Sequence, residues 1–155
     1  ANQITVRGCA FRGNGSGISI GTRDCHNLIE DCTVEENQAA GILARESPRP
    51  TEVHSCLIRR CRVWGNGRTG GQGQVEIQSD AHDLVVEECD LGGTPGKPGI
   101  YAASTARGLF LEADRFSGCY PEVTAEPGSL ALTRPAFECG YGAWPASAFR
   151  HLRTA

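Results

Sequence analysis

A string of four residues near the middle of the chain contains the residue types needed to move a proton. Asp80-Ala81-His82-Asp83 places a histidine, which titrates near neutral pH, beside two carboxylates. Removal of a proton next to a carboxylate needs such a base, together with a group that neutralises the developing negative charge. Arg45 can supply that group. The alternative is structural, because aspartate and histidine are also common in polar turns.

Other polar and aromatic residues occur at equivalent points of successive short apolar segments, with Lys97 entering from the neighbouring turn. An arginine can hold a sugar carboxylate through two parallel hydrogen bonds. A tyrosine can stack on a sugar ring, and a glutamate can act as a base or as a calcium ligand. The alternative is a solvated face that binds nothing. These residues are Arg45, Glu76, Gln78 and Tyr101.

The elements that position these residues follow from an internal repeat. Six equivalent points, 21 to 29 residues apart, each have an apolar residue three positions before and two positions after. Within each unit the apolar period is two, which predicts strands with one buried face. A unit is too short to close its own core, so the units should stack as a solenoid of parallel strands, with a sandwich of β-hairpins as the alternative. The six points are Cys9, Cys32, Cys61, Cys89, Asp114 and Pro135.

The repeat also resembles a known family. The pattern I-x-V-x-x-C-x-F-x-x-N-x-x-G-I-x-I, from Ile4 to Ile20, is similar to the pectate-lyase-like right-handed parallel β-helix superfamily, and it recurs to about Gly140. The resemblance implies an all-β, right-handed parallel β-helix of about six coils of 21–29 residues, with three parallel sheets. It further implies that the short strands at the end of each unit, such as Gly17-Ile18-Ser19-Ile20, form a sheet whose outer face carries a carbohydrate site. The superfamily includes lyases, hydrolases, epimerases, phage tailspikes and adhesins, so the fold alone does not give the function.

The Asp80–Asp83 string is similar to the D-P-H-D motif of mannuronan C5-epimerases, with Ala81 in place of proline. The resemblance implies that His82 is the base and that Asp80 and Asp83 support it. We therefore expect a carbohydrate-active domain that acts on an acidic polysaccharide by lyase or C5-epimerase chemistry. The expected catalytic residues are His82, Asp80, Glu76 and Arg45, and the expected substrate-binding residues are Tyr101, Gln78, Lys97 and Asp83.

Two other functions remain open. A non-catalytic polysaccharide-binding or structural module, such as a tailspike or adhesin segment, would explain the small number of carboxylates. A glycoside hydrolase needs two carboxyl groups about 5–9.5 Å apart, for which Glu76 with Asp80 or Asp114 are candidates. Convergence of Arg45, Glu76, Asp80 and His82 in one groove would favour an enzyme. A turn that carries His82 away from Glu76 would favour the binding module.

Composition limits the partners. The chain has 155 residues, a formal net charge of -3 and a pI near 5.8, which argues against nucleic acid as the partner. No apolar run approaches the roughly 18 residues of a membrane span. With a polysaccharide as the partner, we expect an extracellular or periplasmic location. No cofactor is firmly expected, and calcium, with Glu76 and Asp80 as the available ligands, is the one candidate.

Eight cysteines do not indicate a disulfide framework. Cys9, Cys32, Cys61 and Cys89 should form an inward column of free, buried thiols, because parallel side chains in one column have poor disulfide geometry. If any disulfide forms, Cys119 and Cys139 are the best candidates. The column of Cys25, His54 and His82 spans two coils, roughly 9–10 Å, which is too far for one metal ion.

The expected organisation is a single β-helix domain over residues 1–140 and a capping segment over 141–155, where Tyr141, Trp144, Phe149 and Leu152 can fold over the last coil. At the other end, nothing before Ile4 covers the first coil. Exposed strand edges and apolar side chains are normally protected, so we expect this end to be covered by further β-helix sequence or by another subunit.

Overall fold

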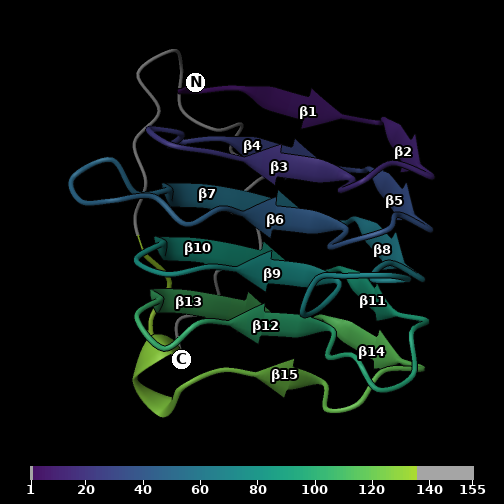
Figure 1. Cartoon of the computed structure of the whole chain (residues 1–155). Helices are drawn as coiled ribbons and strands as arrows, with labels where there is room; N and C mark the ends of the chain where they lie inside the picture. Colours follow the sequence, from purple (N-terminus) through teal and green to yellow (C-terminus); the bar gives the residue numbers. More distant parts are fainter. Residues whose placement is uncertain (1, 136–155) are drawn as a thin grey trace.

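The computed structural model describes residues 2–135, which fold into three parallel five-stranded sheets (Figure 1). Sheet A contains β1 (Thr5–Arg7), β4 (Leu28–Glu30), β7 (His54–Arg59), β10 (His82–Glu87) and β13 (Arg107–Glu112). Sheet B contains β2 (Ala10–Arg12), β5 (Thr33–Glu35), β8 (Arg62–Trp64), β11 (Asp90–Gly92) and β14 (Arg115–Ser117). Sheet C contains β3 (Ile18–Ile20), β6 (Ile42–Ala44), β9 (Val75–Ile77), β12 (Ile100–Ala102) and β15 (Val123–Thr124).

The chain visits the sheets in the order A, B, C and then returns to A one level further along, so each circuit makes one coil (Figure 1). The predicted repeat positions are in register: Ile29 pairs with Val6 and with Ile58 in sheet A. Five full coils are formed within the described residues. The sixth unit is represented by a single bridge between Leu109 and Leu130, which follows the short 3-10 helix η1 (Pro127–Ser129). That helix is too short to cross a membrane.

The inward side chains form one continuous apolar column. Val34, Val63 and Leu91 of sheet B are fully buried, and they pack with the inward residues of sheets A and C. Cys32, Cys61 and Cys89 lie in this column as free thiols, as predicted. The expectation was wrong for Cys9, whose side chain is exposed because the first coil has no described neighbour above it. Cys119 is also free, and Cys139 lies outside the described residues.

The turn from sheet A to sheet B is made in every coil by one residue with positive φ, immediately before the column position. Glycine, which adopts this conformation without strain, occupies only the first of these turns. The others hold residues with a Cβ, so the stacked strands must stabilise a conformation that is locally unfavourable. The five residues are Gly8, Asp31, Arg60, Glu88 and Ala113, with φ of 62°, 53°, 48°, 53° and 54°.

Charged side chains alternate along the outer face of sheet A. Glu30 is 1% exposed and accepts hydrogen bonds from Arg59 Nε at 2.7 Å, from Arg60 Nη2 at 3.0 Å and from Arg7. Burial raises the pKa of the Glu30 carboxyl, but the hydrogen bonds from Arg59 and Arg7 together outweigh this effect. The pKa of Glu30 therefore lies below its ordinary value. Two coils further along, Glu87 accepts a hydrogen bond from Arg134 Nη1 at 2.7 Å. This second pair brings the described end of the chain against sheet A.

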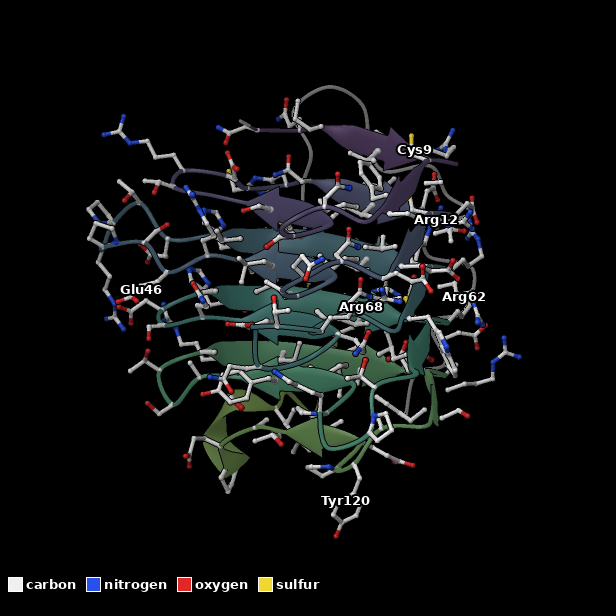
Figure 2. The ribbon with its side chains drawn as sticks, turned by 45° about the vertical axis from the view of Figure 1, so that its right-hand side comes forward. Cys9, Arg12, Glu46, Arg62, Arg68 and Tyr120 are labelled. Atoms are coloured by element: carbon white, nitrogen blue, oxygen red, sulfur yellow. The ribbon has the colours of Figure 1, made fainter. Side chains whose placement is uncertain are left out.

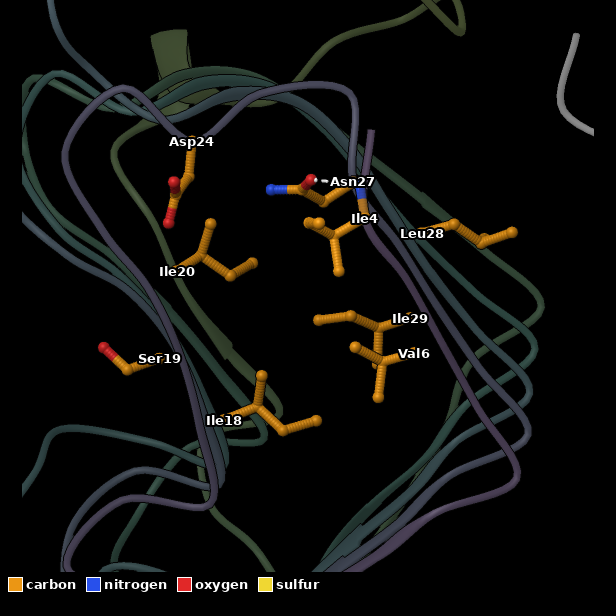
Figure 3. A pocket seen from close by; sticks show the side chains of 9 residues that line it. All are labelled: Ile4, Val6, Ile18, Ser19, Ile20, Asp24, Asn27, Leu28 and Ile29. Atoms are coloured by element: carbon orange, nitrogen blue, oxygen red, sulfur yellow. Dashed lines mark hydrogen bonds between the residues drawn. The ribbon is translucent and has the colours of Figure 1, made fainter. Parts of the chain in front are cut away.

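Among residues 2–135, no segment covers the outer end of the first coil. An apolar cavity of about 180 Å³ lies there, lined by Ile4, Val6, Ile18 and Ile29 among others (Figure 3). Ile4 is 46% exposed. The predicted cap over residues 141–155 lies outside the described residues, so the division of the chain at residue 140 stays a prediction.

Candidate functional site

His82 is the first residue of β10, at the corner where the turn from sheet C enters sheet A. Its ring lies between two carboxylates. Nδ1 is 2.6 Å from Asp83 Oδ2, and Nε2 is 3.6 Å from Glu52 Oε1. The His82 and Glu52 side chains are 18% and 12% exposed, so the pair is accessible but shielded. The other oxygen of Glu52, Oε2, is buried without a hydrogen-bond partner.

Asp83 lies beside His82 because the strand contains a local irregularity. Ala81 and Leu84 both belong to the interior cluster, so the two residues between them lie on the outer side. The register confirms this: His82 pairs with His54 and Leu84 with Cys56, while Asp83 has no partner in the ladder and a φ of 54°. On the next coil the equivalent residue is Gly108. A Cβ built there would come within 2.5 Å of Asp83 Oδ1, so this glycine makes room for the carboxylate.

A stack of imidazole rings adjoins His82. The His54 ring lies parallel to it with centroids 5.0 Å apart, and His26 meets His54 edge-on at 5.5 Å. His54 Nδ1 is 3.0 Å from Ser55 Oγ. Burial, and then the neighbouring His82 and His26 rings, hold the pKa of His54 below its ordinary value. His54 therefore favours the neutral form next to His82.

Asp80 is in the preceding turn, but its contacts are with other residues. Asp80 Oδ1 is 3.0 Å from Arg49 Nη2, and its backbone N–H donates to Thr105 Oγ1 at 3.0 Å. Arg49 belongs to residues 45–53, the segment between β6 and β7. The same segment contributes Glu52 to the His82 cluster, which we define as His82, Asp83, Glu52 and His54. Asp80 thus secures this segment, and none of its contacts described here is with His82.

Glu76 lies in sheet C, in register with Leu43 and Tyr101. The outward position was predicted, but the side chain is covered: Glu76 is only 5% exposed. Its Oε2 accepts the backbone N–H of Gln72 at 2.8 Å, and its Oε1 accepts Gln78 Nε2 at 2.9 Å. The glycine-rich segment 66–73 therefore reaches over this part of the sheet, and both oxygens of the carboxylate are already used.

The remaining predicted residues do not join the His82 cluster through any contact described for residues 2–135. Arg45 reaches back to the preceding coil, where its Nη2 would be 2.8 Å from a Cβ on Gly21. Lys97 Nζ donates to the carbonyl oxygens of Gly70 and Gly71. Tyr101 is half-buried next to Gly73. The predicted residues thus divide between the His82 cluster, the Asp80–Arg49 pair and the covered part of sheet C, while Arg45 is exposed and reaches toward Gly21.

The described residues do not fit a calcium site. Calcium takes six to eight oxygen ligands, whereas Glu76 is held by two amide donors and Asp80 by an arginine. Within residues 2–135, no group of three or more His, Cys, Asp and Glu side chains has an arrangement that could hold a metal ion.

Sequence reasoning missed two neighbours of His82. From the sequence, His54 was considered only as a metal ligand. Its position, seven residues before Cys61, is equivalent to that of His82, seven residues before Cys89. Glu52 carried no signal, because it lies in a segment whose length differs between coils. The repeat also places Arg107 in register with His82 on the next strand, where its side chain is exposed.

A comparison with family models identifies the architecture. The model described as right handed beta helix region matches residues 1–119. Neither a curated protein nor a solved structure matches the chain. The match covers more than half of the chain and agrees with the three parallel sheets, so the chain belongs to the right-handed β-helix family.

Proposed function

We propose that this β-helix acts on an acidic polysaccharide by lyase or C5-epimerase chemistry, with His82 as the residue that moves the proton. One observation carries the proposal: the His82 ring has a carboxylate next to each nitrogen and remains partly exposed on the outer surface. Of the predicted catalytic residues, His82 is the only one for which the surrounding geometry adds support.

The arrangement suits proton abstraction at a carbon next to a carboxylate. With the Nδ1 proton donated to Asp83, the neutral ring presents Nε2 as the base, as in other histidines oriented by a carboxylate. When Nε2 takes the proton, Glu52 Oε1 at 3.6 Å stabilises the new positive charge. Arg107 is the proposed partner for the substrate carboxylate, because it is exposed and in register with His82, whereas Arg45 reaches toward Gly21.

The experiment is a reaction with uronic-acid polysaccharides, with and without calcium, followed in two ways. Ultraviolet absorbance reports the unsaturated product of elimination, and proton exchange at C5 in deuterium oxide reports epimerisation. His82→Gln should lower the rate by about 10²- to 10⁴-fold, the usual contribution of a general base. Asp83→Asn should lower kcat with little change in KM, because it affects ring orientation more than substrate binding.

Glu122→Gln is the matched control, since Glu122 is an exposed carboxylate in the segment before β15. It should leave the rate unchanged. A wild-type protein that binds these polysaccharides without elimination or exchange would contradict the proposal. The same contradiction follows if the His82→Gln variant is fully active.

The second candidate is a non-catalytic polysaccharide-binding or structural module. The observation that favours it is the separation of the predicted catalytic set: Glu76 and Asp80 are engaged by Gln72, Gln78 and Arg49 rather than by His82. A glycoside hydrolase has less support, because both oxygens of Glu76 already accept hydrogen bonds.

The open first coil suggests a further partner. Its apolar cavity and the edge strands β1, β2 and β3 can continue the three sheets. We propose that another coil, from further β-helix sequence or from another subunit, stacks on this end. The proposed location of the protein is extracellular or periplasmic, where acidic polysaccharides are found.

A further inference from the structure

Sheet B carries one aromatic side chain on its outer face. The central residue Val63 of β8 points inward and is fully buried, so Arg62 and Trp64 on either side of it point outward. Trp64 is half-buried. Among the described residues, no acceptor takes a hydrogen bond from its indole N–H.

The indole is seated on the backbone of the next coil. Gly93 has a φ of 78°, and a Cβ built there would collide with the Trp64 ring at Nε1. Any other residue at position 93 would push the indole outward. The absence of a Cβ at Gly93 lets the rigid aromatic side chain pack closely against the backbone, so little side-chain entropy is lost when a ligand packs on it.

Charged groups flank the indole on the neighbouring strands, with Glu35 in register with Trp64 and Asp90 in register with Arg62. Glu35 accepts Arg12 Nε at 3.1 Å and Arg62 Nε at 2.8 Å, and on the other side Asp90 accepts Arg115 Nε at 2.6 Å. These side chains come from successive coils, roughly 4.8 Å apart. They form a row of ion pairs with three arginines against two acids, in which both carboxylates already accept arginine hydrogen bonds, so the remaining N–H groups of the arginines are the donors for a ligand. Arg12 and Arg62 lie on the side of the molecule away from Glu46, which belongs to the segment near His82 (Figure 2).

The guanidinium of Arg62 lies over the Trp64 ring. The guanidinium carbon is 4.5 Å from the ring centroid. Such a cation–π contact at an exposed site is weak, so a ligand can displace it. The displaced guanidinium remains tethered to Glu35 and can then bind a ligand carboxylate or hydroxyl.

We propose that this face, centred on Trp64, is a binding subsite for an acidic oligosaccharide, with a sugar ring packed on the indole and its polar groups on the flanking charged pairs. The mixture of one flat aromatic ring with guanidinium donors suits a ligand that is apolar on its ring face and polar at its edge. The slight excess of arginine favours a sugar that carries carboxylates. The subsite does not depend on catalysis at His82.

The test is calorimetric titration with galacturonate and mannuronate hexasaccharides, and with cellohexaose as a neutral probe. Trp64→Ala should lower the affinity for an acidic hexasaccharide about tenfold or more, whereas Trp64→Phe should keep most of it. Arg62→Ala should weaken binding of the acidic probes relative to cellohexaose, because it removes a cation and uncovers the ring. Gly93→Ala should reduce binding like Trp64→Ala, with circular dichroism confirming the fold.

Two controls separate this subsite from other effects. Tyr120→Ala removes an aromatic ring that is 80% exposed elsewhere and should not change binding. His82→Gln should also leave the Trp64-dependent affinity intact, so failure of the catalytic proposal would not affect this result. The inference is overturned if none of the hexasaccharides binds the wild type, or if Trp64→Ala titrates like the wild type.

Discussion

At the scale of single residues, Asp114 occupies the position that cysteines hold in the earlier coils. Its Oδ1 accepts the backbone N–H of Cys89 at 2.9 Å, and its Oδ2 is buried without a partner. Burial raises the pKa of this carboxyl to about 7, and the nearby Glu87 contributes in the same direction. The neutral acid is therefore the form that suits the folded state.

The raised pKa of Asp114 predicts that the free energy of unfolding falls as the pH rises. Below pH 4 the carboxyl is protonated in both states, and between about pH 4 and 7 only the folded state keeps the proton. The free energy of unfolding should fall over that window by at most about 4 kcal/mol, which is the free-energy equivalent of raising the pKa from 3.8 to about 7. Asp114→Asn should remove this loss, so the variant gains on the wild type as the pH rises from 4.5 to 8. Urea unfolding at several pH values checks it, and parallel profiles for the two proteins would contradict it.

At the scale of elements, an amide ladder closes the turn from sheet B to sheet C. Asn66 is fully buried; its Oδ1 accepts Asn37 Nδ2 at 2.8 Å, and its Nδ2 donates to the carbonyl of Val34 at 2.9 Å. Gln74 continues the ladder by accepting the backbone N–H of Asn66. The repeat of asparagine in the sequence marked this position. The partners of Asn66 lie on other segments, so only the stacked coils show them.

Asn66→Ala should destabilise the fold by about 2–4 kcal/mol, because it leaves several buried donors and acceptors unpaired, each costing about 1–3 kcal/mol. Asn14→Ala is the matched change in the first coil, where the side chain is exposed, and it should cost under about 1 kcal/mol. Denaturant unfolding of both variants gives the comparison. Equal losses would show that the ladder is not what stabilises this turn.

At the scale of the whole molecule, the 155-residue chain on its own, without the further coil proposed above, should be less stable at its first coil than in its central coils. Each coil contacts mainly its neighbours, so an end coil has half the support of a central one. Val6 of sheet A and Val63 of sheet B both point inward, but Val6 lines the cavity at the first coil, whereas Val63 is fully buried in the third coil. Local opening should therefore start near β1 rather than in the central coils.

The same substitution at both sites tests this gradient. Val63→Ala should cost about 1–3 kcal/mol, from lost burial and the cavity left behind, and Val6→Ala should cost less than about 1 kcal/mol. Hydrogen exchange should show earlier opening of β1 to β3 than of β7 to β9. A larger loss at Val6, or uniform exchange along the coils, would argue against an unsupported end.

The amino-acid sequence by itself determined the architecture. The apolar period of two and the recurring inward position are local sequence patterns, and stacking repeats them in each coil. The order and register of the strands therefore follow from the spacing of the repeat. The site was less predictable. The alternation of apolar and polar residues predicted an outward, exposed Glu76, but the segment 66–73 covers its side chain. Glu52 at one ring nitrogen of His82 and the seat of Trp64 on Gly93 depend on how segments of unequal length fold over neighbouring coils. Only the tertiary structure could decide these contacts, because they join residues on different coils that no local pattern relates.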